Sequence, residues 1–262
     1  MILNSKFYIY NNTMVQFWIT LQKLVQYNIK IIFGNKFLYF MLSALAFYVI
    51  TVIVKLLGDD EITQATAYSM LMLPSILLVF YPMCFGIQND QDAKIVEIIF
   101  GIPNYSYKVW LLRLIISYVI CFVITCFLAL LTDLAIVSVP PMGLTLQAMV
   151  PALFIGTLSF MLSTMIKNGN GTSVVIIIIG LLFSMIQGAI GDSQWNIFLN
   201  PYDVPIDKNP QIFFNTVFHC RMNMLIASVL FIIFGLNNTR NREKFKKKSS
   251  LHQGLGVRFF IV

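Results

Sequence analysis

Six long apolar stretches, separated by polar turns, constrain the fold of this chain more than any other feature of its sequence. Each approaches the roughly 20 residues that a helix needs to cross the hydrocarbon core of a bilayer. Near-continuous apolar runs also differ from the alternating ten-residue strands of a membrane β-barrel. The sequence therefore predicts an all-α integral membrane protein with six transmembrane helices. We place these helices near residues 37–57, 67–87, 110–132, 148–166, 172–191 and 218–236.

The composition excludes the main alternatives to a membrane protein. Hydrophobic residues make up 58% of the 262 residues and charged residues 11%, and the mean hydropathy is +0.79. A soluble domain carries about 25% charged residues, and a disordered chain combines low hydrophobicity with high charge. The first 36 residues are too polar for a signal peptide, which would have a short apolar core.

The placement of lysine and arginine predicts the orientation. If the N-terminus is cytosolic, 15 of the 18 basic residues fall on the cytosolic side, including those at 88–109 and 167–171. Only Lys55, Lys208 and Arg221 fall outside. The excess of basic residues in cytosolic segments sets membrane orientation, so we expect both termini in the cytosol. The predicted organisation is a cytosolic N-terminus (1–36), a transmembrane domain (37–236) and a basic cytosolic tail (237–262).

The chain lacks the motifs of several kinds of chemistry. No phosphate-binding loop GxxxxGK[ST], no HExxH and no GxSxG occurs. The four cysteines and two histidines have no metal-binding spacing. Lys55, Arg113 and Asp133 lie near span ends, where long side chains reach toward the headgroups. We expect no catalytic, cofactor or metal site on this chain, and uncharged spans argue against an ion-coupled carrier.

Residues 14–33 form an amphipathic pattern before the first span. Lys23 and Lys30 lie on the polar side, and Trp18 lies on the apolar side. Such a helix lies in the membrane interface with its apolar face toward the lipid. The sequence predicts an interfacial helix here, and the alternative is a simple anchor.

The connection between spans two and three holds a second, shorter amphipathic pattern. Asn89 is a predicted N-cap, acidic residues follow it, and Gly101 ends the pattern. A short helix over 90–100 would have one polar and one apolar side, suited to contact a soluble partner. A loop lying on the lipid is the alternative. The candidate residues are Asp90, Asp92, Lys94, Ile95, Glu97, Ile99, Phe100 and Pro103.

Small residues recur at every fourth position in spans four and five. Such stripes let helices approach closely. Packing within one chain is favoured over a dimer seam, because the short turn at 167–171 makes the two spans an antiparallel hairpin. The members are Ala148, Ala152 and Gly156 in span four, and Gly180, Ser184 and Gly188 in span five.

The connection between spans five and six, residues 188–215, is rich in aromatic residues and proline. It predicts short or re-entrant helices at the outer interface rather than a solvated loop. The C-terminal tail is basic, which suits anchoring on anionic lipid better than nucleic-acid binding.

These features together resemble the membrane subunit of an ABC exporter of the type-2 permease family. Members have an interfacial elbow helix, six spans with both ends inside, a coupling helix between spans two and three, and re-entrant helices between spans five and six. The run EIIFGIPNYS at 97–106, followed by Arg113, resembles the family's acidic residue, apolar stretch, proline and serine ahead of a basic residue.

The resemblance implies a transport subunit without enzymatic activity. Two permease copies, or this chain and a homologue, would pair with two cytosolic ATPase subunits that bind Mg-ATP, in a bacterial cytoplasmic membrane. ATP binding would move the coupling helices and switch a central cavity from inward-open to outward-open. The cargo itself is not identified by the sequence: the aromatic and methionine-rich spans would suit an amphiphilic or lipidic cargo, and a lipid-facing surface has the same composition. A membrane scaffold or sensor subunit is the alternative, and an ion-driven carrier is a third.

Overall fold

The computed structural model describes residues 22, 26, 37–58, 61–92, 106–166 and 168–258, without side-chain detail at 90–92, 106–108 and 240–258. Within these residues the secondary structure is helical and no strand occurs. Six of the helices are long and apolar enough to cross a membrane. They fit the predicted multi-pass membrane protein. The elements are α2 (Phe37–Leu57), α3 (Gln64–Asp92), the π-helical turn η1 (Ser106–Leu111), α5 (Leu112–Ala135), α6 (Pro141–Ile166), α7 (Gly169–Ile190) and α8 (Pro210–Arg258).

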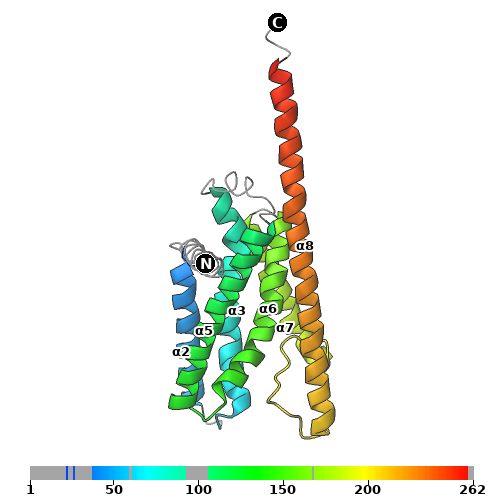
Figure 1. The fold of residues 1–262 in the computed structure, drawn as a ribbon. Helices are drawn as coiled ribbons and strands as arrows, with labels where there is room; N and C mark the ends of the chain where they lie inside the picture. Colours follow the sequence, from blue (N-terminus) through cyan, green and yellow to red (C-terminus); the bar gives the residue numbers. More distant parts are fainter. Residues whose placement is uncertain are drawn as a thin grey trace, which may run out of the picture.

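The six helices run up and down, so that their connections alternate between the two ends of the bundle (Figure 1). One end, here called the tail end, holds the start of α2, the end of α3, the start of α5 and the α6–α7 turn. Helix α8 projects from this end. The opposite end, here called the far end, holds the α2–α3 and α5–α6 turns and the segment 191–209. The predicted alternation of connections is thus present.

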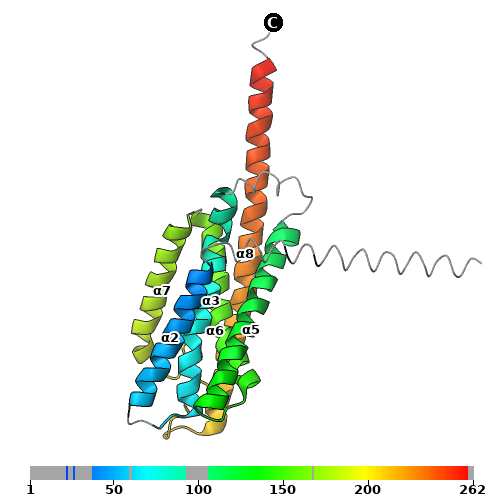
Figure 2. The same ribbon diagram turned by 90° about the vertical axis from the view of Figure 1, so that its left-hand side faces the viewer.

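Helices α3 and α6 form the centre of the bundle. α3 packs against α2, α5, α6 and α7, and α6 also packs against α8. α3 has the largest buried share of the six spans and α7 the smallest. α2 and α7 are the two least buried spans, and Figure 2 shows α7 at the left edge of the bundle.

Local sequence signals set several helix ends. Asn168 Oδ1 accepts hydrogen bonds from the backbone N–H groups of Asn170 and Gly171 and caps α7. Asn209 Oδ1 accepts from Gln211 N at 2.9 Å, one residue before α8 begins at Pro210. Proline suits the first position of a helix because the N–H it lacks has no partner there. α7 ends at Ile190, and its C-cap residue Gly191 has a φ of +53°, which favours glycine.

Two helices begin well before the predicted spans. α6 begins at Pro141 and α8 at Pro210, each earlier than the apolar stretch that it contains. The reason is that caps and first-turn prolines set helix starts, whereas hydropathy marks only the lipid-facing part.

The prediction of short or re-entrant helices between spans five and six was wrong for the described backbone. Residues 191–209 form successive turns without a helix. The side chains of Asn196 and Asn200 accept from Phe198 N and Tyr202 N, both at 3.0 Å. These side chains compete with helical hydrogen bonding, and Pro201 and Pro205 lack the N–H that a helix interior needs.

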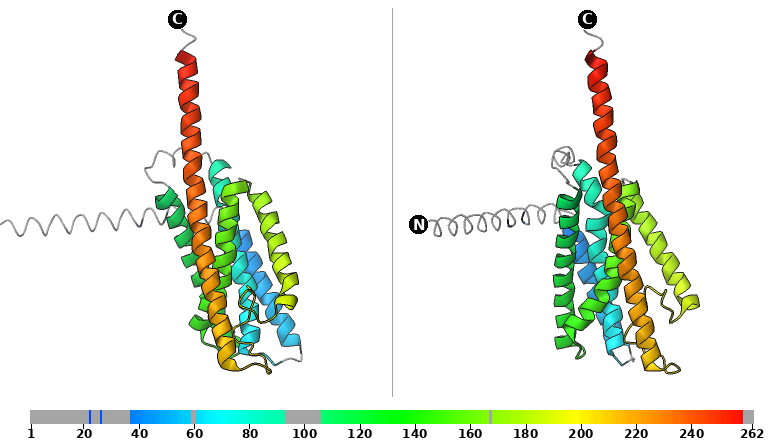
Figure 3. Two further views of the ribbon diagram at one scale, coloured as in Figure 1. Left: turned by 90° about the vertical axis from the view of Figure 1, so that its right-hand side faces the viewer. Right: turned by 45° about the vertical axis from the view of Figure 1, so that its right-hand side comes forward.

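The basic tail is continuous with the last span. α8 has 49 residues and extends to Arg258, so no break separates the predicted span at 218–236 from the tail (Figure 3). No glycine–proline or other breaking sequence interrupts residues 236–248. The helix therefore continues past the apolar stretch and projects from the bundle.

Candidate functional site

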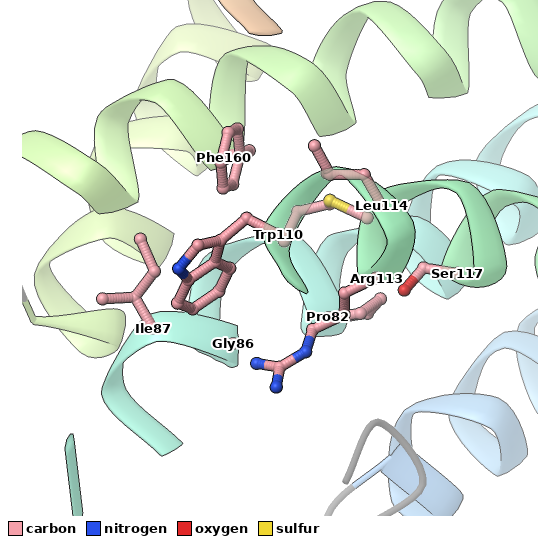
Figure 4. Close-up of a pocket in the computed structure, with 9 residues that line it drawn as sticks. Pro82, Gly86, Ile87, Trp110, Arg113, Leu114, Ser117 and Phe160 are labelled. Carbon is pink, nitrogen blue, oxygen red and sulfur yellow. The ribbon is translucent and has the colours of Figure 1, made fainter. Parts of the chain in front are cut away.

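A small pocket lies at the tail end, between the last turns of α3 and the start of α5, which the connection 93–105 links along the chain. It is lined by α3, by η1, by the start of α5 and by α6 (Figure 4). Its volume is about 10 Å³, which is room for about one water molecule. The lining residues are Pro82, Met83, Gly86, Ile87, Trp110, Arg113, Leu114, Ser117 and Phe160.

Arg113 and Trp110 form the polar part of this pocket. The Arg113 guanidinium carbon lies 4.8 Å from the centre of the Trp110 ring, within the range of a cation–π contact. Trp110 lies over Gly86, where an added Cβ would be 3.8 Å from the indole. The expectation that Arg113 reaches toward headgroups was wrong, since the side chain is only 5% exposed. The π-helical turn η1 immediately precedes α5 and brings Trp110 and Arg113 to the same pocket.

Ser117 adds a hydrogen-bonding group to the pocket wall. Its side chain is buried, and its Oγ has no hydrogen-bond partner among the described residues. Buried hydroxyls ordinarily have a partner. The pocket volume suits a single water molecule that would supply one.

A second set of contacts joins the end of α3 to the α6–α7 turn. Gln88 Oε1 accepts a hydrogen bond from Gly169 N at 2.6 Å. A Cβ at Gly169 would lie 2.5 Å from Phe85 and 2.7 Å from Gln88, so the turn fits α3 only with glycine. Ser163 Oγ donates to Cys84 O at 3.0 Å one turn further into the bundle. Movement at the end of α3 therefore reaches α6 and α7 directly.

Most of the predicted tail-end residues lie outside the described part of the chain. Asp90 and Asp92 belong to the last turn of α3. Asn89 is therefore not an N-cap, and its amide donates to Tyr81 Oη at 3.0 Å. The predicted elbow helix is described only at Gln22 and Gln26, which are helical. Outside the described residues lie Trp18, Lys23, Lys30, Lys94, Ile95, Glu97, Ile99, Phe100 and Pro103.

The two small-residue stripes have different surroundings. Ala148 and Ala152 are fully buried, and a Cβ at Gly156 would overlap Tyr118 and Val79. At Gly180 and Gly188 no atom of the described residues comes within 4 Å of an added Cβ, and Ser184 is exposed. The favoured packing within one chain thus fits α6 but not α7. The α7 stripe points away from the bundle because α3 and α6 cover its other side.

A buried arginine lies at the far end that the sequence pattern does not predict. The pattern places Arg221 on the outer side of the membrane without indicating burial, whereas the side chain lies within α8 and is 6% exposed. Its guanidinium bonds to Tyr68 of α3, Gln147 of α6 and the backbone of Leu199. Burial raises the pKa of the adjacent Tyr202 phenol, and Arg221 partly lowers it. The available signal was an arginine inside the predicted span 218–236.

No cluster of three or more His, Cys, Asp or Glu residues that could hold a metal ion occurs among the described residues. Several buried hydroxyls, such as those of Ser75 and Thr157, bond to the backbone of their own helix, whereas Ser163 Oγ and Tyr118 Oη bond to a neighbouring helix. The six apolar helices fit a multi-pass membrane protein.

Comparison of the chain with protein-family models, with curated proteins and with solved structures finds no match.

Proposed function

We propose that this chain is the permease subunit of an ATP-driven ABC exporter of the type-2 permease family. The observation that carries the proposal is the position of α3. The connection 93–105, which contains most of the predicted amphipathic pattern, follows its tail end along the chain, and α3 packs against α2, α5, α6 and α7. A displacement of that connection by a soluble ATPase would therefore move most of the bundle.

The contacts at the tail end support this mechanical role. The Gln88–Gly169 hydrogen bond ties α3 to the α6–α7 turn, and Asn238 Nδ2 donates to Thr164 O at 3.0 Å, tying α8 to α6. Arg113 and Trp110 fix the other side of the connection at the start of α5. The resemblance implies that two cytosolic ATPase subunits bind Mg-ATP and act on this end, and that a second permease copy or homologue completes the complex.

The distribution of charge favours an external energy source over an ion gradient. The central parts of the six spans contain no carboxylate: Asp133 lies at the end of α5, and Asp90 and Asp92 lie at the end of α3. A proton relay would need a group that releases and takes up protons.

The remaining parts of the proposal follow from the resemblance and the composition. The chain would lie in a bacterial cytoplasmic membrane with both termini in the cytosol. Phenylalanine, tyrosine and methionine together provide 47 residues, which suits an amphiphilic or lipidic cargo as well as a lipid-facing surface.

The test is co-purification of an ATPase with the affinity-tagged chain, followed by ATP hydrolysis in proteoliposomes. Two variants of the connection, Glu97→Lys and Phe100→Ala, should weaken the association by about tenfold, as the loss of a central interface contact does. Two matched changes away from the connection, Asp207→Lys and Phe218→Ala, should leave it unchanged, because both side chains are exposed.

Absence of any bound ATPase would contradict the proposal and favour the membrane scaffold or sensor. Equal association of all four variants would show that residues 93–105 do not contact the ATPase.

A further inference from the structure

A buried cation joins three helices and the 191–209 segment at the far end of the bundle. Arg221 Nη2 donates to Tyr68 Oη on α3 and to the backbone oxygen of Leu199, both at 2.9 Å. Arg221 Nε donates to Gln147 Oε1 on α6 at 3.1 Å. The guanidinium also lies 5.8 Å from the centre of the Tyr68 ring. One side chain of α8 thus contacts α3, α6 and the segment at once.

The acceptors around Arg221 are neutral. Among the described residues no carboxylate forms an ion pair with it, and its hydrogen-bond acceptors are a phenol, an amide, a backbone carbonyl and the Met224 thioether at 3.9 Å. A buried charge is tolerated only when its hydrogen bonds are made. Removing one acceptor leaves part of the buried guanidinium without a partner, which is unfavourable. The contacts of Arg221 with α3, α6 and the 191–209 segment therefore stabilise one another.

The 191–209 segment covers apolar residues of α8. Asn200 Nδ2 donates to Ala65 O at the start of α3 at 2.9 Å, and Cys220 Sγ donates to Asn196 O at 3.2 Å. Ile197 and Leu199 pack with Phe213, Val217 and Cys220 in one buried cluster. Cys220 is 1% exposed beneath the segment.

From these contacts we infer that residues 191–209 are the outer gate of the bundle and that Arg221 is the positioning residue that holds this gate closed. The inference rests on the proposed transport function. Opening would lift the segment from α3 and α8 and admit water to Arg221. Water replaces the lost acceptors of a guanidinium, so the open state would keep its charge solvated.

Cys220 provides a reporter for this movement. The protein carries Cys220 alone, with Cys84, Cys121 and Cys126 replaced by serine or alanine, and is reconstituted with its ATPase. A membrane-impermeant maleimide is added on the far side. Without nucleotide the thiol should react slowly, because the hydrogen bonds to the Arg221 guanidinium stabilise the closed segment over Cys220. Mg-ATP with vanadate should open the segment and raise the labelling rate by about tenfold or more, since loss of one such bond corresponds to about a tenfold change in the closed population.

Variants separate the role of Arg221 from general loss of structure. Arg221→Gln should raise the labelling rate of Cys220 without nucleotide, and Tyr68→Phe, which removes one acceptor, should raise it less. Lys208→Gln is the matched control, since Lys208 carries the same charge and lies on the 191–209 segment itself but forms only an exposed ion pair with Asp192. A second protein carrying Cys121 alone, buried in α5, should stay unlabelled in every variant.

The outcomes distinguish this inference from the proposed function. If Cys220 stays equally protected with and without Mg-ATP while the complex hydrolyses ATP, the gate is refuted and the transport function stands. If no ATPase associates, the proposed function fails. Even then, the Cys220 labelling rates of the variants without nucleotide show whether Arg221 holds the segment closed. Equal labelling rates for Arg221→Gln and Lys208→Gln would refute this role of Arg221.

Discussion

At the scale of single residues, glycine positions separate contacts inside the bundle from the surface of the spans. Gly156 on α6 lies where α3 and α5 come closest to it, and Tyr118 Oη donates to Leu153 O at 3.0 Å beside it. Gly180 on α7 belongs to the same kind of stripe in the sequence but has no neighbour within 4 Å among the described residues. The same residue type therefore has different consequences at the two positions.

Replacing Gly156 by alanine should destabilise the protein, because the new methyl group would overlap Tyr118 and Val79 and break the Tyr118 hydrogen bond. Overpacking of this kind costs about 1–3 kcal/mol. Gly180→Ala is the matched control and should not lower the unfolding temperature. Thermal unfolding of both variants in detergent measures the difference, and equal unfolding temperatures would contradict the packing described here.

At the scale of elements, the 191–209 segment illustrates how non-helical backbone is accommodated next to a membrane. Its amides bond within single turns, with Asn196 N and Leu199 N donating to Ser193 O and Asn196 O at 3.0 and 3.1 Å. Two asparagine side chains accept further amides. Satisfied backbone groups allow the segment to lie against apolar side chains.

Hydrogen exchange should follow these bonds. In nanodiscs, peptides covering residues 196–203 should exchange slowly, because their amides are bonded and partly buried. Residues 205–208 contain the fully exposed Ile206 and should exchange faster. Uniformly fast exchange over 192–208 would mean that the segment does not rest on the bundle.

At the scale of the whole molecule, the up-and-down arrangement has a consequence for orientation. The start of α2, the α6–α7 turn and the projecting end of α8 share the tail end of the bundle. The basic residues of the sequence concentrate in these same parts, which predicts that the tail end is cytosolic.

Single cysteines in a background without native cysteines should report this orientation. An impermeant reagent added to intact cells should label Glu61→Cys and Asp207→Cys, which are exposed at the far end, but not Ser5→Cys or Gln91→Cys. Permeabilised cells serve as the control, in which the latter two should also react. Labelling of Ser5→Cys and Gln91→Cys in intact cells would reverse the predicted orientation.

The sequence alone determined the number of spans and the alternation of their connections. Both depend on local quantities: the length of an apolar stretch and the turn residues between stretches, such as Asn168 and Pro141. α2 has the predicted bounds, Phe37–Leu57, because its stretch is flanked by polar residues on both sides.

Only the tertiary structure decided which charged and small residues are buried. Arg221 is held by acceptors that lie 153, 74 and 22 residues away in sequence, on two other helices and a turn segment. Arg113 packs on Trp110 in a pocket completed by α3 and α6. A hydropathy pattern records the character of each residue but not its distant partners, and burial of a charge depends on those partners.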